Sequence, residues 1–140
     1  MIIYSEMSVI FLTKRFHFES AHRMWNAAFS VEQNHADFGK CQNIHGHNYI
    51  LELTVSGEID PAKGYFINLH TLAKEVQENI IDVIDHKYLN DILPGKKHLP
   101  VTIEVIAQWI WDTLHEDLPI YNYSKLRLWE TPDNSTEISK

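Results

Sequence analysis

The segment from Cys41 to His47, Cys-Gln-Asn-Ile-His-Gly-His, places the only cysteine of the chain and two of its histidines within seven residues. If His45 and His47 lie on a β-strand, their alternate spacing directs both side chains to the same face of that strand. Two neighbouring imidazoles can then occupy two corners of a tetrahedral metal site. Gly46 has no side chain and lets another backbone approach closely at this point. The segment therefore favours a fold in which one strand carries two metal ligands.

The position of the cysteine indicates a catalytic rather than a structural metal. Cys41 lies four residues before His45, so a turn can bring its thiol beside a metal without making it a ligand. Structural zinc normally has four protein ligands, whereas catalytic zinc leaves one position open for water or substrate. The alternative, from these residues alone, is a pair of half-exposed histidines and a buried, unreactive cysteine. The candidate third ligand is His22, at the end of the predicted first strand.

The length and charge of the chain limit the functions open to it. Its 140 residues are expected to form one domain over residues 1–140. A formal net charge of -7 argues against general nucleic-acid binding, which needs a basic surface. A single cysteine allows no internal disulfide and is typical of the reducing cytoplasm, where we expect the protein to lie. The apolar run at residues 9–12 ends at Lys14, too short for a membrane span, so no membrane partner is expected.

The N-terminal half of the chain is predicted to be mostly β-structure. Residues 1–8 are expected to form a loose leader, and residues 8–22, rich in β-branched and aromatic side chains, a first strand. Residues 24–40 show no sustained period and are predicted to be a long loop. Apolar and polar residues alternate before Gly57, which predicts a second strand. A turn followed by a short strand at 65–68 would make residues 47–68 a hairpin.

The C-terminal half is predicted to be mostly helical. Apolar residues at helical spacing from Leu69 to Ile84 predict an amphipathic helix of about four turns. Thr102 is the expected N-cap of a second helix. Residues 125–130 are predicted to be a last strand and residues 133–140 a frayed polar tail. This order predicts an α+β fold, an antiparallel four-stranded sheet with two helices on one face.

Three more titratable residues lie where predicted elements end. Asp85 and His86 follow the first helix, and Glu130 ends the last strand. Each has an ordinary interpretation, because isolated carboxylates are usually solvated and a histidine at a helix C-terminus can complement the helix dipole. Their functional interpretation depends on being brought to the candidate metal ligands.

Taken in order, these segments resemble the motifs of the 6-pyruvoyl-tetrahydropterin synthase and 6-carboxy-tetrahydropterin synthase family, which has the tunnelling fold. The resemblance extends over about residues 14–131, and its specificity lies in the order and spacing of many short matches. The matching segments are Phe18–Arg23, Phe38–Cys41, His45–Tyr49, Gly57–Pro61, Asn68–Leu69, Ile84–Lys87, Thr102–Ala107, Trp109–Trp111 and Glu130–Thr131.

The resemblance implies a lyase that acts on 7,8-dihydroneopterin triphosphate and uses Zn²⁺ as a Lewis acid. It assigns zinc binding to His22, His45 and His47. It also implies that a Cys41 thiolate removes protons from the substrate side chain, because the thiolate is the reactive form of cysteine. Asp85 and His86 would serve as its proton relay from a neighbouring subunit.

The resemblance also implies a binding role for three residues. Glu130 would accept hydrogen bonds from the ring N–H and the amino group of the pterin, a pairing that suits a carboxylate. Thr102 and Glu104 would line the same pocket. The candidates for triphosphate contacts are Lys14, Arg15 and Arg23.

Within this family the sequence favours the carboxy-forming branch. Only three residues separate Cys41 from His45, and residues 88–92 and 109–112 also resemble that branch. The expected reaction then yields 6-carboxy-tetrahydropterin, acetaldehyde and triphosphate, on the route to queuosine, a deazapurine tRNA base. The alternative is 6-pyruvoyl-tetrahydropterin synthase, which the long loop ending in Phe38–Cys41 resembles. A metal-binding or pterin-binding module without turnover is a third hypothesis, disfavoured because a binder needs no proton relay.

An oligomer is expected for a physical reason and from the resemblance. A sheet with helices on one face leaves two exposed edges and a bare face, and exposed edges pair readily with other chains. Closing three such sheets into a barrel removes these edges. The family resemblance implies this closure and a homohexamer of two trimers, with active sites between subunits.

Overall fold

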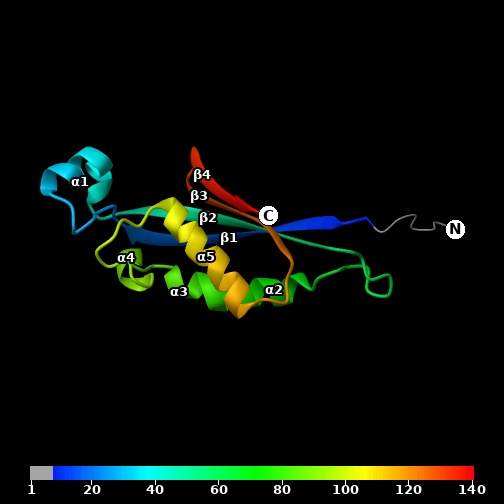
Figure 1. Ribbon diagram of the computed structural model, residues 1–140. Coiled ribbons are helices and arrows are strands. Elements are labelled where there is room, and N and C mark those ends of the chain that lie inside the picture. The colour runs from blue at the N-terminus through cyan, green and yellow to red at the C-terminus, as the bar shows by residue number, and fades with distance from the viewer. Residues whose placement is uncertain (1–7) are drawn as a thin grey trace.

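The computed structural model describes residues 8–140, so the expected leader at residues 1–8 lies outside the described residues except for Ser8. The described part of the chain forms one antiparallel sheet in the order β1-β2-β3-β4 (Figure 1). The strands are β1 (Ile10–His22), β2 (His45–Gly57), β3 (Tyr123–Thr131) and β4 (Asn134–Ser139). The predicted first, second and last strands are therefore confirmed within a few residues.

The helices of the core cover one face of this sheet, as predicted (Figure 1). The first predicted helix is a continuous run of α2 (Leu69–Val76), a π-helical turn η2 (Gln77–Ile81) and α3 (Asp82–Ile84). The second is α5 (Ile103–Asp117), and the Thr102 hydroxyl caps it by accepting the Val105 N–H at 3.2 Å. No helix within residues 8–140 is both long and apolar enough to cross a bilayer.

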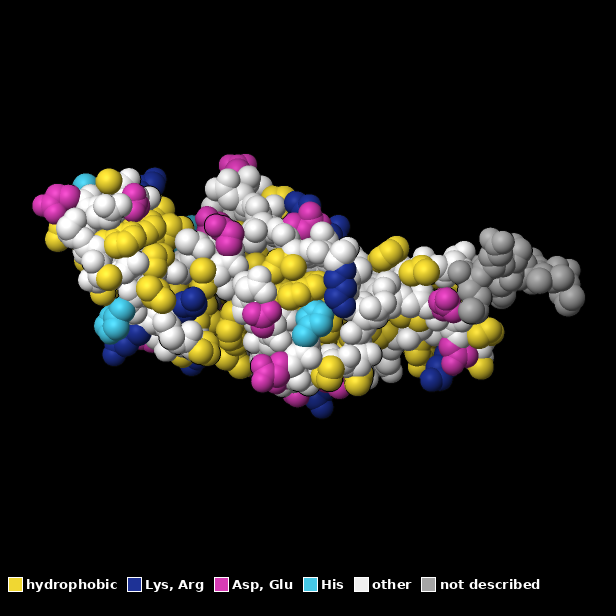
Figure 2. All heavy atoms as spheres, in the orientation of Figure 1, with side chains coloured by type: hydrophobic (Ala, Val, Ile, Leu, Met, Phe, Trp, Pro, Cys, Tyr) yellow, Lys and Arg dark blue, Asp and Glu magenta, His cyan; other side chains and the backbone are white. Residues whose placement is uncertain are grey.

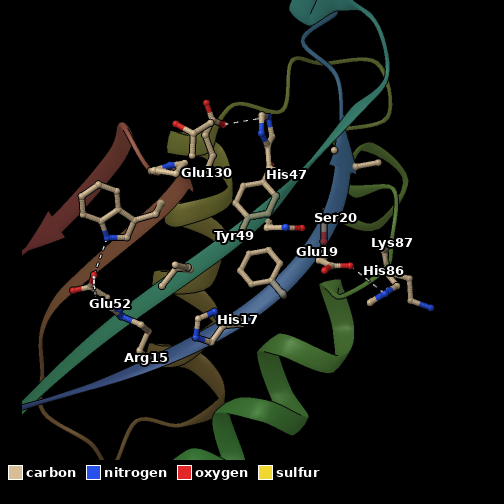
Figure 3. Close-up of a pocket in the computed structure, with 18 of the residues that line it drawn as sticks. Arg15, His17, Glu19, Ser20, His47, Tyr49, Glu52, His86, Lys87 and Glu130 are labelled. Carbon is tan, nitrogen blue, oxygen red and sulfur yellow. Dashed lines mark hydrogen bonds and ion pairs between the residues drawn. The ribbon is translucent and has the colours of Figure 1, made fainter.

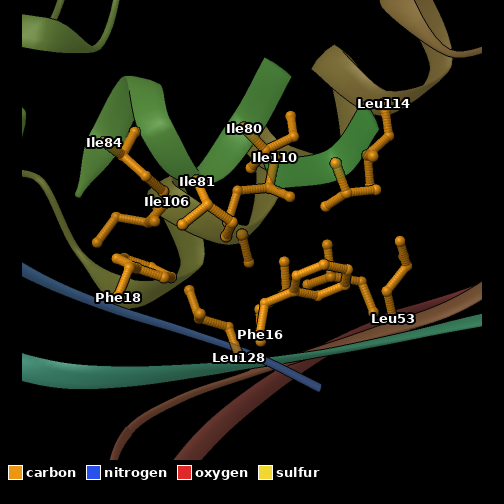
Figure 4. Close-up of a cluster of buried hydrophobic side chains, with 14 of the residues drawn as sticks. Phe16, Phe18, Leu53, Ile80, Ile81, Ile84, Ile106, Ile110, Leu114 and Leu128 are labelled. Carbon is orange, nitrogen blue, oxygen red and sulfur yellow. The ribbon is translucent and has the colours of Figure 1, made fainter. Parts of the chain in front are cut away.

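The hydrophobic core lies between the sheet and these helices (Figure 4). Alternate strand residues point to the helices, so that Phe16, Phe18, Leu51 and Leu53 are all buried. The helical side chains that face them are also inaccessible to solvent: Ile80, Ile81, Ile84, Ile106, Ile110 and Leu114. Each fully buried side chain of this size contributes about 1.5–3 kcal/mol, so the core fixes how the strands and helices are placed.

The fourth strand is not the one that the sequence predicted. The proposed hairpin over residues 47–68 is wrong, because Tyr65 makes only an isolated bridge to Asp60 and residues 65–68 form no strand. Phe66 instead packs its ring against the backbone of Gly57. The predicted frayed tail is wrong too, since its residues form β4, paired along β3. The count of four strands and the antiparallel α+β class are confirmed.

Two segments predicted to be loops contain short helices. The segment 24–40 includes α1 (Val31–Phe38) and the start of a 3₁₀ turn, η1 (Gly39–Gln42), and the loop after the first long helix includes α4 (Leu89–Ile92). Ser30 caps α1 by accepting the Gln33 N–H at 3.0 Å. Both helices are too short to show a sustained apolar period, which is why the sequence pattern missed them.

We predict that β4 stabilises the domain. Removing residues 134–140 would expose the edge of β3 and take away Ile138, which packs against the core. The truncated chain should unfold at a lower denaturant concentration than the full chain, and amides of β4 should be protected from hydrogen exchange in the full chain. Fast exchange throughout residues 134–139, together with an unchanged unfolding midpoint, would favour the frayed tail.

Candidate metal-binding active site

The register between β1 and β2 brings the three predicted metal ligands together. His22 lies opposite His45, and Ser20 lies opposite His47, across the same antiparallel ladder. The ring centroid of His22 lies 4.5 Å from that of His45 and 5.1 Å from that of His47. The ring centroids of His45 and His47 are 5.0 Å apart. One ring nitrogen from each residue falls within 4.8 Å of the other two. This is the spacing of three ligands around one ion.

The remaining hydrogen bonds of the cluster leave Nε2 available for a metal. Nδ1 of His22 lies 2.7 Å from the carbonyl oxygen of Val101, and Nδ1 of His45 lies 2.7 Å from that of Asn43. Each carbonyl can accept a hydrogen only from a protonated Nδ1, which puts the lone pair on Nε2. Nε2 of His22 is buried and has no hydrogen-bond partner within residues 8–140. A buried polar atom without a partner fits a ligand position.

Burial keeps these imidazoles in the form that binds a metal. Desolvation, opposed by the hydrogen bond to Val101 and helped by the neighbouring His45 and His47, lowers the pKa of His22 to about 4. Burial also lowers the pKa of His47, although the Glu130 carboxylate partly opposes this. A metal ligand must be neutral, so the pKa shifts of both residues favour metal binding at neutral pH.

Gly46 lies between the two candidate ligands of β2, where the strands approach closely. It stands opposite Ala21, and a Cβ atom built on it would lie 3.2 Å from the carbonyl oxygen of Ser20. Such a contact is tighter than normal packing allows, so a side chain here would push β1 away from β2. The absence of a side chain at Gly46 therefore keeps β1 and β2 close enough for His22 to lie near His45 and His47.

Glu130 and Tyr49 form a polar wall beside the cluster. An oxygen of Glu130 lies 3.9 Å from Nε2 of His47, and Tyr49 stacks on Phe18 with ring centroids 4.8 Å apart. Within the described chain, the Tyr49 hydroxyl and one Glu130 oxygen are buried without a hydrogen-bond partner. Burial, helped by the Glu130 charge, raises the pKa of Tyr49, so its hydroxyl stays a donor. This wall can hold a ligand with both donors and acceptors.

The sequence analysis gave Tyr49 no role of its own and named it only as the end of the matching segment His45–Tyr49. Its position two residues after His47 puts it on the same face of β2 as both histidines. That spacing was the available signal for a role in the site.

Asp85 and His86 form a second group, at the end of α3. Their side chains are joined by a contact of 2.9 Å between Asp85 Oδ1 and His86 Nδ1. The backbone N–H of Glu19 donates to the same Asp85 oxygen at 2.9 Å. That hydrogen bond is the main cause that lowers the pKa of Asp85; desolvation opposes it, and the interactions with His86 lower the pKa further. The aspartate is therefore held as an anion that can orient the imidazole.

A cavity of about 1200 Å³ joins the second group to the polar wall (Figure 3). Its lining combines ionisable side chains with aromatic ones: Arg15, His17, Glu19, His47, Tyr49, Glu52, His86, Lys87, Trp129 and Glu130. Trp129 donates its ring N–H to Glu52 at 2.8 Å, and Glu52 also pairs with Arg15 at 3.2 Å. The lining thus includes one residue of the histidine cluster, His47, together with Glu130 and His86.

Of the residues predicted for the site, the lining includes His47, His86 and Glu130. Among the described residues, three others belong neither to this lining nor to the histidine cluster or the Asp85–His86 pair. Cys41 lies in η1, partly exposed, and its carbonyl accepts the Met24 N–H at 2.9 Å. Thr102 caps α5, next to the carbonyl that binds His22, and Glu104 is exposed in the first turn of that helix. The predicted roles of Cys41, Thr102 and Glu104 therefore stay predictions, and one chain does not place Cys41 against His86.

The three residues considered for triphosphate contacts do not all lie at the cavity. Arg15 lines the cavity, whereas Lys14 and Arg23 do not belong to its described lining. Arg23 donates its Nε–H to the Gln42 carbonyl at 2.8 Å. Lys87, which the sequence pattern did not single out, lines the cavity beside His86.

Comparison with known proteins gives a consistent result over nearly the whole chain. The family model described as 6-pyruvoyl tetrahydropterin synthase matches residues 11–140. The chain is 40% identical over 125 residues to a Homo sapiens protein named 6-pyruvoyl tetrahydrobiopterin synthase, covering 88% of this chain and 86% of the relative. A Dictyostelium discoideum protein of the same name is 36% identical over 125 residues, covering 89% and 92%.

The fold of the chain is also similar to that of a solved member of this family. The solved structure of Caenorhabditis elegans 6-pyruvoyl tetrahydropterin synthase superposes with a TM-score of 0.85 at 29% identity. The match covers 96% of this chain and 97% of that one. The similarity thus includes the strands that carry the histidine cluster as well as the helices behind them.

We predict that the histidine cluster binds one divalent metal ion per chain. Changing His22, His45 or His47 to Ala should remove most of the bound metal, because each would leave only two protein ligands. His70→Ala, on the exposed side of α2, is the matched control and should keep it. Elemental analysis of the purified proteins measures the metal, and circular dichroism checks the fold. Full metal content in all three variants would contradict the assignment.

Proposed function

The chain belongs to the 6-pyruvoyl tetrahydropterin synthase family, whose enzymes are lyases, and from this membership we propose that it converts 7,8-dihydroneopterin triphosphate to 6-pyruvoyl-tetrahydropterin and triphosphate. The observation that carries this proposal is the 36–41% identity, over nearly the whole chain, to proteins named 6-pyruvoyl tetrahydrobiopterin synthase. The cavity beside the histidine cluster, with Glu130 in its wall, supports a pterin as the ligand.

The comparisons favour this reaction over the carboxy-forming one that the spacing after Cys41 indicated. The three intervening residues end in an exposed connection, where Ile44 is 63% accessible to solvent. A connection of this kind can change in length without moving His45 or the strand after it. The spacing is therefore a weak guide to the reaction, and a route to queuosine has less support than the pyruvoyl product.

The proposed metal is zinc, held by Nε2 of His22 and His45 and by His47. Three imidazoles with one remaining position are the ligand set of a catalytic zinc. When bound, zinc would supply Lewis-acid stabilisation of negative charge on the side-chain oxygens of the substrate. The hydrogen bonds from Nδ1 to Val101 and Asn43 support this assignment, because such bonds orient ligating histidines.

The proposed reaction needs proton transfers and no external oxidant or reductant. The substrate is a dihydropterin with a hydroxylated side chain, and the product is a tetrahydropterin with a diketone side chain. The ring therefore gains the two hydrogens that the side chain loses, while triphosphate leaves with its bonding electrons. We assign proton removal from the side chain to Cys41 as thiolate, with His86 as its proton partner and Asp85 orienting the imidazole.

Glu130 is the proposed anchor of the pterin ring. Its buried oxygen lacks a partner within residues 8–140 and can accept hydrogen bonds from the pterin N–H and amino group. Because it lies 3.9 Å from a metal ligand, an anchored pterin would have its side chain near the histidine cluster. Thr102 and Glu104 are proposed to contact the substrate only in the assembled protein, since they lie outside the cavity of one chain.

We predict the product of the reaction directly. The zinc-loaded protein incubated with 7,8-dihydroneopterin triphosphate should release triphosphate and a 6-pyruvoyl-tetrahydropterin, without acetaldehyde. Mass spectrometry of the pterin and an acetaldehyde assay distinguish the two reactions. Acetaldehyde in equal amount to the pterin would establish the carboxy-forming alternative, and binding without any product would favour a module without turnover.

The proposed protein is an oligomer whose active sites lie between subunits. Within the described chain, β1 and β4 are the two edges of an open sheet, and the face opposite the helices is uncovered. Hydrophobic side chains are also exposed at the end that carries α1 (Figure 2), among them Phe29, Val31 and Ile44. A barrel of three sheets, paired into a hexamer, would cover these features and bring His86 to the Cys41 of a neighbour.

Subunit mixing tests this arrangement. Cys41→Ala and His86→Ala chains should each be inactive, while a mixture dissociated and reassembled should regain activity, because some sites would combine two intact halves. The activity of the mixture, the mass of the assembly in solution and a mixture of each variant with itself are measured together. A monomeric mass with no recovery would contradict a shared site.

A further inference from the structure

The end of β1 holds the Asp85–His86 pair through its backbone. The Glu19 N–H donates to Asp85 Oδ1 at 2.9 Å, and the Glu19 carbonyl accepts the His86 N–H at 2.6 Å. One residue further, the Ser20 hydroxyl donates to the Ile84 carbonyl, and beyond it the Ala21 N–H donates to the Lys87 carbonyl at 3.0 Å. These bonds fix the turn in which His86 takes a left-handed backbone angle, φ 58°.

The side chain of Glu19 also contacts His86, in addition to these backbone hydrogen bonds. Its carboxylate oxygen lies 3.5 Å from His86 Nε2 (Figure 3). Asp85 Oδ1 lies 2.9 Å from the other ring nitrogen, Nδ1. The imidazole therefore stands between two carboxylates, one at each nitrogen. The only other charged neighbour along this turn that lines the cavity, among the described residues, is Lys87.

The contact between Glu19 and His86 is expected to affect the reaction more than the stability of the fold. The side chains of Glu19 and His86 are 60% and 72% exposed in one chain, and an exposed ion pair contributes about 0–1 kcal/mol to folding. An exposed imidazole that must exchange a proton needs a fixed direction, however. A misplacement of about 1 Å can cost on the order of a hundredfold in rate. Asp85 alone fixes one end of the ring.

We propose that Glu19 is a positioning residue for the reaction, whose carboxylate accepts the Nε2–H of His86 and so fixes the imidazole between Asp85 and Glu19. The proposal rests on the proposed function, in which His86 is the proton partner of Cys41. Glu19 borders the cavity, and the role proposed for it is exerted through His86. With both nitrogens donating, the ring is a doubly protonated imidazolium, oriented before the neighbouring subunit and substrate arrive. Its Nε2 proton is the one passed on, leaving Glu19 as this proton goes to its acceptor in the assembled site.

Two substitutions at residue 19 separate the side chain from the backbone. Glu19→Ala keeps both backbone hydrogen bonds and loses the acceptor, and it should lower kcat about ten- to a hundredfold with little change in KM. Glu19→Gln keeps an acceptor oxygen and should recover part of the loss. Glu116→Ala removes an exposed carboxylate near the end of α5 and is the matched control, expected to change neither kcat nor KM. Thermal unfolding of all variants should be the same within error.

A nitrogen NMR signal tests the contact without substrate. The ring-nitrogen signal of His86 Nε2, identified by its loss in His86→Ala, should move in Glu19→Ala and stay in Glu116→Ala. A kcat in Glu19→Ala equal to that of the control, or a raised KM with unchanged kcat, would overturn the positioning role. A signal that does not move would overturn the contact itself.

The same design separates this proposal from the proposed function. If the wild-type protein forms no product from 7,8-dihydroneopterin triphosphate, the proposed function fails. The nitrogen signal then decides the placement of His86 by itself: a shift in Glu19→Ala supports it, and an unchanged signal overturns it.

Discussion

Thirteen residue pairs join β1 to β2, from Ile10 opposite Gly57 to His22 opposite His45, and this register positions the three histidines of the candidate metal site. The same alternation that buries Phe18 and Leu51 under the helices directs the histidines to that face. A slip of one residue would turn every side chain of a strand to the other face and expose its apolar set. Hydrophobic packing along the strands therefore holds the ligand geometry at their ends, and metal binding does not have to supply it.

The helical layer completes the site through backbone groups. Val101, just before α5, provides the carbonyl that binds Nδ1 of His22, and its own N–H donates to the Arg23 carbonyl at 3.1 Å. Asn90, which is 2% exposed, accepts the Arg23 N–H at 3.0 Å and donates to the Arg23 and Leu99 carbonyls. Hydrogen bonds thus hold the residue that follows β1 to the loop before α5. As a result, Nδ1 of the buried His22 stays bonded to the Val101 carbonyl and its Nε2 points to the other two histidines.

The fold was predictable where a pattern repeats over many residues. The alternation of β2 and the helical spacing from Leu69 to Ile84 are such patterns, and both elements are confirmed. β4 was missed because its residues are polar on both faces and only Ile138 packs against the core. It becomes a strand because β3 offers an unpaired edge beside it. The strand predicted at 65–68 has no such neighbour, and Phe66 packs against Gly57 instead.

The sequence by itself determined the chemistry available to this protein: a histidine pair at strand spacing, a third histidine at the end of another strand, and the segments that identify the family. These are local properties of residue type and spacing. Only the tertiary structure decided that Nε2 of His22 faces the cluster, that Tyr49 and Glu130 share a wall, and that Glu19 meets His86. Each of these contacts joins residues far apart in the chain, and their distance depends on how the strands and helices pack together, which no local pattern encodes.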